Sequence, residues 1–329
     1  MTAALDGRRF WHAVLVADAD DTIACVLVPE LRHRIAAGQA VLMVVGDTTA
    51  RIVQDGLAGA ADALEWARPG DFYQRLGSTY RNFDRYLAEQ HTRRRVVHLV
   101  AEPDVVGDPS APVDRVKAYL DYEAMVSEGF ARYGCPITCV WHRGHHPPPV
   151  IDELRRVHSH ELTWSGLRTS AAYVPPADYL DRRVPAAMTP VAVKTDVDLI
   201  VTEPDEMSAC RAAVARWAAD RHFVPAAVRQ VVSACSEVVS NGLRHGRPPV
   251  RIRAWSQDAT LIVDVEDHGG RAIPATAGYR QPRTLADPGG LWIARQLADV
   301  LLTRTGGGRT AVRMYFPYAV VHQDLGMAY

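Results

Sequence analysis

The sequence lacks any long hydrophobic run, and this excludes a membrane-spanning helix of the usual kind. In its 329 residues, no apolar stretch approaches the roughly 18–20 residues that such a helix needs. The opening residues, MTAALDGRRFW, contain arginines but no apolar core behind them, so we expect no signal peptide. The sequence therefore predicts a cytoplasmic protein with no membrane partner.

An excess of either charge sign is also missing. Lys and Arg number 37 against 38 Asp and Glu, which gives a formal net charge of −1. The short basic runs, such as residues 93–95, are typical of a solvated helix end. Direct binding to nucleic acid is therefore not expected, because such binding normally uses a basic patch or stripe.

Cysteine is scarce, and its pattern predicts no disulfide framework. The five cysteines are odd in number and lie mostly within apolar segments. Reduced, buried thiols in a cytoplasmic protein are the expected state. A hydrophobic content of 48% with 23% charged residues is typical of a soluble globular protein.

The length of the chain favours two domains, and the first of them has an alternating pattern. Apolar, strand-like runs alternate with amphipathic, helix-like segments such as residues 23–37, which stop at Gly38. Asp18, Asp20 and Asp21 suit the N-cap of that helix. Continuous apolar strands separated by helices predict a parallel sheet covered on both faces. We therefore expect an α/β fold. The strand-like runs are residues 10–17, 40–47, 63–67, 96–101 and 136–141.

Prolines accumulate after this region and mark a linker. They include Pro175, Pro176, Pro185 and Pro190. Beyond the linker the order becomes strand, helix, helix, two strands, helix and a final strand, which is a mixed α+β layout. The predicted organisation is a first domain over residues 8–178, a linker over 179–195 and a second domain over 196–318.

One helix of the second domain carries a polar stripe. Residues 226–245 place apolar side chains every three or four positions. Glu237, Asn241 and His245 are spaced four residues apart, so they lie along one edge of that apolar face. An amide oxygen suits Mg²⁺, and a carboxylate can accept a proton or orient water. An ordinary surface helix is the alternative when the triplet is taken alone.

The segments that follow this helix favour a nucleotide site. Residues 260–267 form a predicted strand that ends at Asp267, and Gly269 follows it. Gly289 and Gly290 open a predicted helix whose apolar face includes residues 293, 294, 297, 300 and 301. Such an opening presents free N–H groups to phosphate. A glycine-rich turn then leads into a last strand that contains Thr310.

This order of motifs resembles the GHKL superfamily, which has the Bergerat fold and binds ATP with Mg²⁺. The sequence is most similar to the anti-sigma-factor serine kinases over residues 196–318. The resemblance implies that Glu237 is the general base and Asn241 the Mg²⁺ ligand. It also implies nucleotide-binding roles for the matching residues of the other motifs. These residues are His245, Asp267, Gly269, Gly289, Gly290 and Thr310.

Two positions depart from the family's pattern. Arg271 stands where the motif D-x-G-x-G has its second glycine, and Pro288 stands where the motif G-x-G-L has its first. Proline removes a backbone donor and stiffens the loop that closes over the nucleotide. ATP binding is therefore better supported than ATP turnover.

The resemblance implies a cytoplasmic regulator of transcription: an anti-sigma factor that phosphorylates serine or threonine of an antagonist protein. Its partners would be a sigma factor, the antagonist or both, and self-association as a homodimer is expected. Autophosphorylation on histidine is not expected, because no phosphoacceptor-histidine helix precedes the module. The alternative is a non-catalytic interaction protein whose degenerate ATP pocket only gates partner binding.

The first domain has no phosphate-binding loop after its first strand, because residues 16–20 do not match G-x-x-x-x-G-K-[ST]. The distribution of His12, Tyr122, Glu123, Cys139 and His158 is similar to that of the MEDS sensory domain. That resemblance implies a RecA-like fold without the nucleotide loop. It also implies a site for a small molecule at these five residues.

A second pattern in the first domain suggests a metal. Cys139, His142, His145 and His146 form C-x-x-H-x-x-H-H, which is not a standard zinc spacing. An exposed polar turn is the expected structure of the three histidines. For His12, a satisfied core histidine is the alternative to a ligand contact.

Overall fold

The computed structural model describes residues 10–103, 105, 108–282 and 289–324, which divide into two compact units. The first unit comprises most of the described chain up to residue 183. The second comprises residues from 184 onward together with the short segments 74–79 and 108–118. No helix in the described ranges is both long and apolar enough to cross a membrane.

The first unit is built on a seven-stranded sheet in the order β3-β2-β4-β5-β1-β6-β7. All neighbouring strands pair in parallel except β6 and β7, which form an antiparallel hairpin at one edge. The predicted α/β fold is confirmed, and the edge hairpin is an element that the sequence pattern did not reveal. The strands are β1 (His12–Ala17), β2 (Ala40–Val44), β3 (Glu65–Trp66), β4 (Val97–Ala101), β5 (Ile137–His142), β6 (His160–Thr163) and β7 (Gly166–Thr169).

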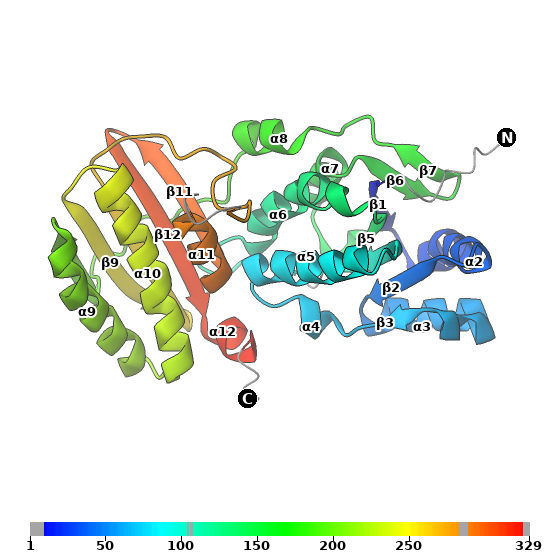
Figure 1. The fold of residues 1–329 in the computed structure, drawn as a ribbon, viewed down its shortest axis with the longest axis horizontal. Coiled ribbons are helices and arrows are strands. Elements are labelled where there is room, and N and C mark those ends of the chain that lie inside the picture. The colour runs from blue at the N-terminus through cyan, green and yellow to red at the C-terminus, as the bar shows by residue number, and fades with distance from the viewer. Residues whose placement is uncertain (1–9, 104, 106–107, 283–288, 325–329) are drawn as a thin grey trace. The chain divides into compact units, whose positions relative to one another are not determined.

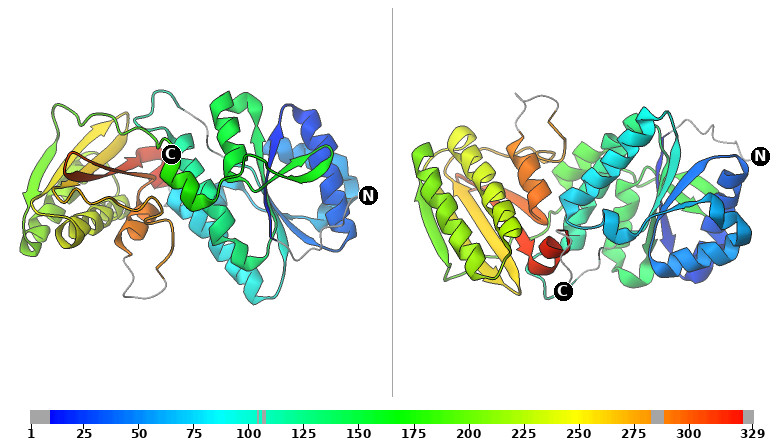
Figure 2. Two further views of the ribbon diagram at one scale, coloured as in Figure 1. Left: turned by 90° about the horizontal axis from the view of Figure 1, so that it is seen from above. Right: turned by 60° about the horizontal axis from the view of Figure 1, so that its bottom comes forward.

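Helices cover both faces of this sheet. Figure 2 shows the blue helices α1–α3 on one face and the cyan to green helices α5–α7 on the other. The helices are α1 (Asp20–Thr22), α2 (Val28–Ala36), α3 (Asp47–Leu57), α4 (Pro69–Phe72), α5 (Leu76–Thr92), α6 (Arg115–Gly129), α7 (Pro148–Val157) and α8 (Pro176–Arg182). Short helical turns are η1 (Ile23–Leu27), η2 (Ala58–Ala63), η3 (Ala131–Tyr133) and η4 (Arg143–His145).

Three local expectations for the first unit can be compared with the structure. Gly38 follows α2 with a φ of +68°, which confirms it as the glycine that ends the helix. The N-cap before α1 is Ala19 without a side-chain cap, so the expected aspartate cap was wrong. Cys25 is exposed while the other four cysteines are buried, so the expectation of buried thiols was wrong for this one.

The second unit is a five-stranded antiparallel sheet with helices on one face. Its order is β11-β12-β10-β9-β8. Figure 1 shows α9, α10 and α11 packed on the same side of this sheet. The elements are β8 (Val197–Val201), η5 (Pro204–Glu206), α9 (Met207–Asp220), α10 (Pro225–His245), β9 (Val250–Gln257), β10 (Thr260–Asp267), α11 (Gly290–Leu297), β11 (Val300–Gly306), β12 (Arg309–Pro317) and α12 (Tyr318–Asp324).

The two faces of this second sheet differ because strand residues alternate in direction. The face beneath the helices is apolar, with Ile252, Val263 and Met314 fully buried against α9 and α10. The opposite face carries Asp264 and Arg313, which are also buried. Burial there requires pairing, since an unpaired buried charge is costly.

The helix expected to span residues 290–301 is shorter, and this expectation was wrong at its end. Helix α11 ends at Leu297, and residues 300 and 301 belong to strand β11. The apolar positions fit a helical spacing, but the backbone pairs with β12 in an antiparallel ladder. The hairpin between β11 and β12 turns at Gly307 and Gly308, whose φ values of +58° and +75° suit glycine.

The predicted linker contains ordered structure. Helix α8 extends to Arg182, so the predicted boundary at residue 178 falls inside a helix. Later in the segment, the carbonyl oxygen of Thr189 accepts a hydrogen bond from the Arg313 guanidinium. Residue 189 of the segment therefore contacts the outer face of the second sheet.

Candidate functional site: a cavity in the second unit and a buried cluster in the first

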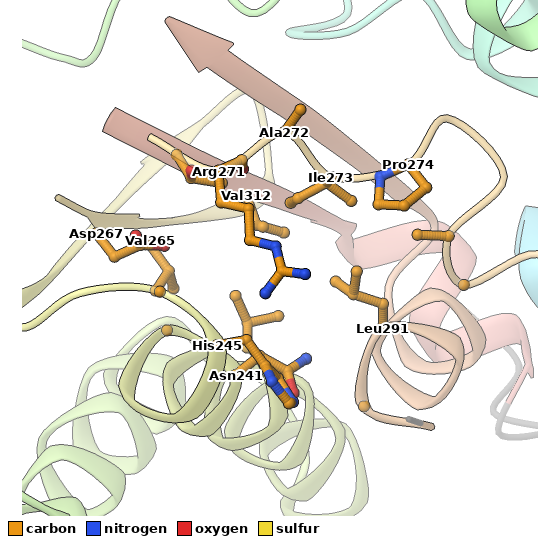
Figure 3. A pocket seen from close by; sticks show the side chains of 17 residues that line it. Asn241, His245, Val265, Asp267, Arg271, Ala272, Ile273, Pro274, Leu291 and Val312 are labelled. Carbon is orange, nitrogen blue, oxygen red and sulfur yellow. Dashed lines mark hydrogen bonds between the residues drawn. The ribbon is translucent and has the colours of Figure 1, made fainter. Parts of the chain in front are cut away.

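A cavity of about 430 Å³ lies between α10, the end of β10, the start of α11 and β12. Its lining includes Asn241, Asp267, Gly290 and Thr310, which come from four separate segments of the chain. His245 also lines it (Figure 3). These residues, which the sequence singled out, are therefore close together in space.

Glycines let α10 approach the sheet closely enough to place Asn241 over the cavity. A Cβ atom on Gly242 would lie 3.0 Å from Cγ2 of Val250, and one on Gly246 would lie 2.4 Å from Cγ of Asp267. The second distance is shorter than side chains tolerate, so only glycine fits at residue 246 without displacement. The end of α10 is thus packed directly against Asp267.

Asp267 is held in a fixed orientation at the end of β10. Its Oδ1 accepts hydrogen bonds from the backbone N–H groups of Gly269 at 2.7 Å and Arg247 at 3.3 Å. A Cβ atom on Gly269 would approach this oxygen to 2.8 Å, which explains a glycine at that position. Oδ2 has no donor among the described residues. The carboxylate therefore presents one open acceptor at the cavity.

Thr310 lies directly opposite Asp267 in the ladder between β10 and β12. Its hydroxyl donates a hydrogen bond to the carbonyl oxygen of Arg271 at 3.0 Å. This bond ties the segment after β10 to the last strand. The threonine is thereby connected to both walls of the cavity.

The start of α11 forms the opposite side of the cavity. Gly289 is the N-cap residue and Gly290 the first residue of the helix. A Cβ atom on Gly290 would lie 2.7 Å from Nδ2 of Asn241, so this close approach depends on glycine. The N–H groups at the helix start have no intrahelical partners, which favours an anion there. Pro288, the second departure from the family motif, lies outside the described residues.

Glu237 is not part of the cavity lining. It is half-buried on α10, one turn before Asn241. Its neighbour Val238 lines the cavity, but Glu237 does not. The predicted catalytic carboxylate therefore lies beside the cavity and not within it.

Arg271 is part of the site rather than merely a missing glycine. Figure 3 shows its guanidinium projecting into the cavity toward Asn241 and Leu291. The sequence identified the position but could not indicate where the side chain points.

Sequence reasoning missed Arg295, which holds the cavity wall in place. This buried side chain donates hydrogen bonds to the carbonyl oxygens of Ala277 at 3.2 Å and Leu301 at 3.0 Å. Its guanidinium also lies 3.8 Å from the ring centroid of Tyr279. It thereby fastens the segment after β10 to α11. No local sequence signal marks this role, because the partners come from two separate segments, one on each side of α11 in the chain.

In the first unit, four of the five predicted sensory residues meet in the interior. One ligand atom each from His12, Glu123, Cys139 and His158 lies within 4.8 Å of the others, and all four residues are buried. Tyr122 is buried next to Glu123 on α6, but its ring is near Tyr80, with a centroid separation of 6.4 Å. It does not belong to the cluster.

Burial governs the electrostatics of this cluster. Burial, followed by the nearby His158, lowers the pKa of His12 to about 4, although Glu123 opposes this effect. Burial favours a higher pKa for Glu123, but the adjacent imidazoles of His12 and His158 hold it well below its ordinary value. Burial raises the pKa of the Cys139 thiol. Around neutral pH the unliganded cluster therefore contains a carboxylate beside the uncharged His12 and a protonated thiol.

A second cavity of about 360 Å³ lies at the carboxyl ends of β2, β4 and β5. His142, His145 and His146 line it, and Glu102 accepts a hydrogen bond from Nε2 of His142 at 3.0 Å. His145 is exposed while His142 and His146 are half-buried, so the expected exposed turn is only partly present. Cys139 belongs to the buried cluster instead, so the C-x-x-H-x-x-H-H pattern does not form one metal group among the described residues.

Two family models match the chain. Residues 11–159 match the MEDS domain, described as the MEthanogen/methylotroph, DcmR Sensory domain. Residues 200–316 match the histidine kinase-like ATPase domain. No curated protein matches the chain at a significant level.

Several solved structures are similar to parts of the chain. The RsbU and RsbW domains of Rv1364c from Mycobacterium tuberculosis share 20% identity over 36% of this chain, with a TM-score of 0.27. This chain covers 31% of that structure, or about a third of its length. The histidine kinase AdeS of Acinetobacter baumannii shares 11% identity over 43% of this chain and 73% of its own, with a TM-score of 0.25.

The histidine kinase domain of the blue-light activated kinase EL346 from Erythrobacter litoralis is a third similar structure. It shares 19% identity over 75% of this chain and 96% of its own, with a TM-score of 0.27. The two family matches coincide with the two sites, since the buried cluster lies within residues 11–159 and the large cavity within residues 200–316. The chain thus carries an N-terminal MEDS domain and a C-terminal histidine kinase-like ATPase domain.

Proposed function

We propose that the C-terminal domain binds ATP with Mg²⁺ in the cavity of about 430 Å³. The observation that carries this proposal is the convergence of Asn241, Asp267, Gly290 and Thr310 on one cavity. The residues fit a nucleotide. Asp267 has an open acceptor oxygen for an amino group, and the start of α11 offers unpaired N–H groups for phosphate.

The walls of the cavity fit an adenine ring between these polar groups. Val265 and Val312 come from paired strands, and Ile273 and Leu291 come from the segments on either side of the opening. Binding sites for small molecules are mostly apolar with a few polar groups that fix orientation. In this arrangement the Asp267 end takes the base and the Asn241 end takes the phosphates.

We propose that Asn241 supplies a side-chain oxygen to the magnesium ion. The ion would neutralise phosphate charge when it is bound. Glu237, one turn earlier on α10, would accept the proton of an attacking hydroxyl.

The substrate we propose is a serine or threonine of an antagonist protein, and the binding partner is a sigma factor. This proposal rests on the resemblance of the motif order to the anti-sigma-factor serine kinases. The MEDS domain, with a proposed RecA-like fold over residues 8–178, would control this activity by sensing a ligand or partner. An anti-sigma-factor kinase of this kind would regulate transcription in the cytoplasm. We propose that the protein assembles as a homodimer.

Label transfer tests the kinase. The full chain is used to capture its partners from the source cell, with and without ATP. The captured antagonist is then incubated with the chain and γ-labelled ATP. We expect label on serine or threonine of the antagonist, and none with Glu237→Gln. Label on a histidine of the chain itself would contradict the proposal.

A non-catalytic role is the second candidate, and two observations favour it. Arg271 projects into the cavity, and Glu237 is absent from the cavity lining. In that role nucleotide binding would only gate a partner. Partner capture that responds to ATP without any label transfer is the result that separates this candidate from the kinase.

A further inference from the structure

The buried cluster of the MEDS domain has the composition of a metal site. Its members come from β1, α6, β5 and the residue after α7, so four separate segments contribute one side chain each. His12 and Cys139 reach the cluster from adjacent parallel strands, where their register places them on the same face of the sheet. The exposed fractions of the four residues are 0%, 1%, 4% and 0% in chain order.

The hydrogen bonds around the histidines direct a lone pair of each ring into the cluster. Nδ1 of His158 lies 2.8 Å from the carbonyl oxygen of Leu154, which can only accept, so this nitrogen carries the proton. Nδ1 of His12 lies 3.0 Å from Oγ of Ser127, whose own proton can go to a backbone carbonyl. In a neutral ring, Nε2 of each histidine is then an acceptor.

Acceptor atoms therefore face one another in the interior. Nε2 of His158 lies 3.0 Å from Oε1 of Glu123, and neither atom makes a hydrogen bond of acceptable geometry among the described residues. Nε2 of His12 lies 3.7 Å from the same oxygen and 3.4 Å from Sγ of Cys139. Buried acceptors without a donor are unfavourable, so a cation between Nε2 of His158 and Oε1 of Glu123, either a proton or a metal ion, would stabilise them.

The separations suit one ion with four ligands. Zinc binds histidine nitrogen at about 2.0–2.1 Å, carboxylate oxygen at about 2.0–2.2 Å and thiolate sulfur at about 2.3 Å. A tetrahedron with those bonds places its ligand atoms roughly 3.3–3.7 Å apart. Three of the six separations, 3.0, 3.4 and 3.7 Å, lie within a few tenths of an ångström of that range, and all six are within 4.8 Å, so the side chains would draw slightly closer around a bound ion.

We propose that His12, Glu123, Cys139 and His158 bind one transition-metal ion, with Zn²⁺ as the expected occupant. Two imidazoles, one thiolate and one carboxylate are ligands that zinc accepts. Binding releases the thiol proton of Cys139 to solvent, because the thiolate is the metal ligand. The bonds from Nδ1 to Leu154 and Ser127 orient the two rings, as outer partners of metal-binding histidines commonly do. This site is independent of the proposed nucleotide function.

Metal analysis of the full chain tests this proposal directly. The protein is purified without a histidine tag or chelator, and its metal content is measured by mass spectrometry. We expect close to one zinc ion per chain in the wild type. Cys139→Ser should lose most of it, because one of four ligands is removed. Cys135→Ser is the matched control, since Cys135 is also a buried cysteine of this domain but lies outside the cluster.

Cobalt substitution gives a readout that does not depend on a variant folding. The wild-type protein is unfolded with a chelator and refolded with Co²⁺. We expect an intense thiolate-to-cobalt absorption band together with the visible bands of a tetrahedral site. Absence of the thiolate band, or equal zinc content in wild type and Cys139→Ser, would overturn the proposal. The cluster would then be a histidine–carboxylate pair that shares a proton.

Discussion

Arg271 is the residue whose meaning changed most between sequence and structure. In the sequence, Arg271 was notable only because it replaces the second glycine of the family's D-x-G-x-G motif. In the structure its guanidinium enters the cavity toward Asn241, on the side where we place the phosphates (Figure 3). A cation there can form charge-assisted hydrogen bonds with phosphate oxygens.

Replacement of Arg271 by alanine is therefore expected to weaken ATP binding. Loss of one charged hydrogen bond corresponds to about 1.5–3 kcal/mol, or roughly a tenfold or larger increase in Kd. Adenosine, which has no phosphates, should bind with unchanged affinity. Titration calorimetry of both ligands measures this, with Arg304→Ala as an exposed control in the same domain. Tighter ATP binding by Arg271→Ala would instead show that the side chain obstructs the cavity.

Gly290 gives a second prediction at this scale. A methyl group at this position would collide with the Asn241 amide, at 2.7 Å from Nδ2. Gly290→Ala should therefore displace Asn241 from the proposed magnesium ion. Loss of this contact with a charged group should raise the Kd for Mg·ATP by about tenfold or more. Gly306→Ala is the matched control, because a Cβ atom there meets nothing within 4 Å. Equal affinities of the two variants would contradict the proposed position of Asn241.

At the scale of elements, the centre of the second sheet depends on a buried ion-pair network. Asp264 on β10 lies 2.8 Å from Arg313 on β12 and 2.8 Å from Arg253 on β9. Its side chain is only 1% exposed, so water cannot replace a lost partner. This one carboxylate therefore joins three adjacent strands.

Asp264→Asn should destabilise the C-terminal domain strongly. Removal of one member of a buried pair leaves uncompensated charge, which typically costs about 3–5 kcal/mol. Asp198→Asn is the matched control, because Asp198 pairs with Arg251 on the same sheet but both side chains are more than two-fifths exposed. Urea unfolding should show a large loss for the first variant and little change for the second. Similar losses for both would contradict the view that burial makes the first pair important.

The ends of β4 and β5 carry a pair that predicts a pH dependence. A hydrogen bond with Glu102 raises the pKa of His142 above its ordinary value of 6.5. Burial would raise the pKa of Glu102, but hydrogen bonds with His142 and Thr49 lower it below 4.5. The histidine contributes stability that is full below pH 6.5 and is lost as the pH rises through its folded pKa. The carboxylate contributes stability above pH 4.5 that is lost as the pH falls through its folded pKa.

The stabilisation from this pair should therefore be largest between pH 4.5 and 6.5. NMR titration should give His142 a pKa above 6.5 in the wild type and a lower one in Glu102→Gln. The difference in Tm between the two proteins should shrink as the pH rises past that value. An unchanged His142 titration in Glu102→Gln would rule out this account of the pair.

Elements whose apolar residues follow a clear pattern could be predicted from the sequence. Elements whose structure depends on pairing with another part of the chain could not. The strand at residues 260–267 was predicted from its apolar run before Asp267, and α10 was predicted from apolar residues that recur every three or four positions. Residues 300 and 301 continued a helical spacing by coincidence, and their pairing with β12 decided their structure. The hairpin of β6 and β7 is short and half-buried, so its pattern was too weak to recognise.

At the scale of the whole molecule, the two domains were predicted because each carries an ordered set of motifs. The candidate site residues of the ATPase domain could be named because they occur in motifs with fixed spacing, and Asn241, Asp267, Gly290 and Thr310 line one cavity. Arg295 was missed because it acts through the backbone carbonyl groups of Ala277 and Leu301, and no side-chain pattern marks such contacts. In the MEDS domain, four residues chosen by resemblance proved to be neighbours, but their direct contact with one another could not be read from spacing.

The central claim is that the cavity of the ATPase domain binds Mg·ATP through Asn241. Its most direct test is calorimetric titration of the full chain with ATP, with and without Mg²⁺, for the wild type and Asn241→Ala. Arg244→Ala, an exposed position on the same helix, is the control. We predict magnesium-dependent binding by the wild type and the control, and its loss in Asn241→Ala. Undiminished Mg·ATP binding by Asn241→Ala would contradict the claim.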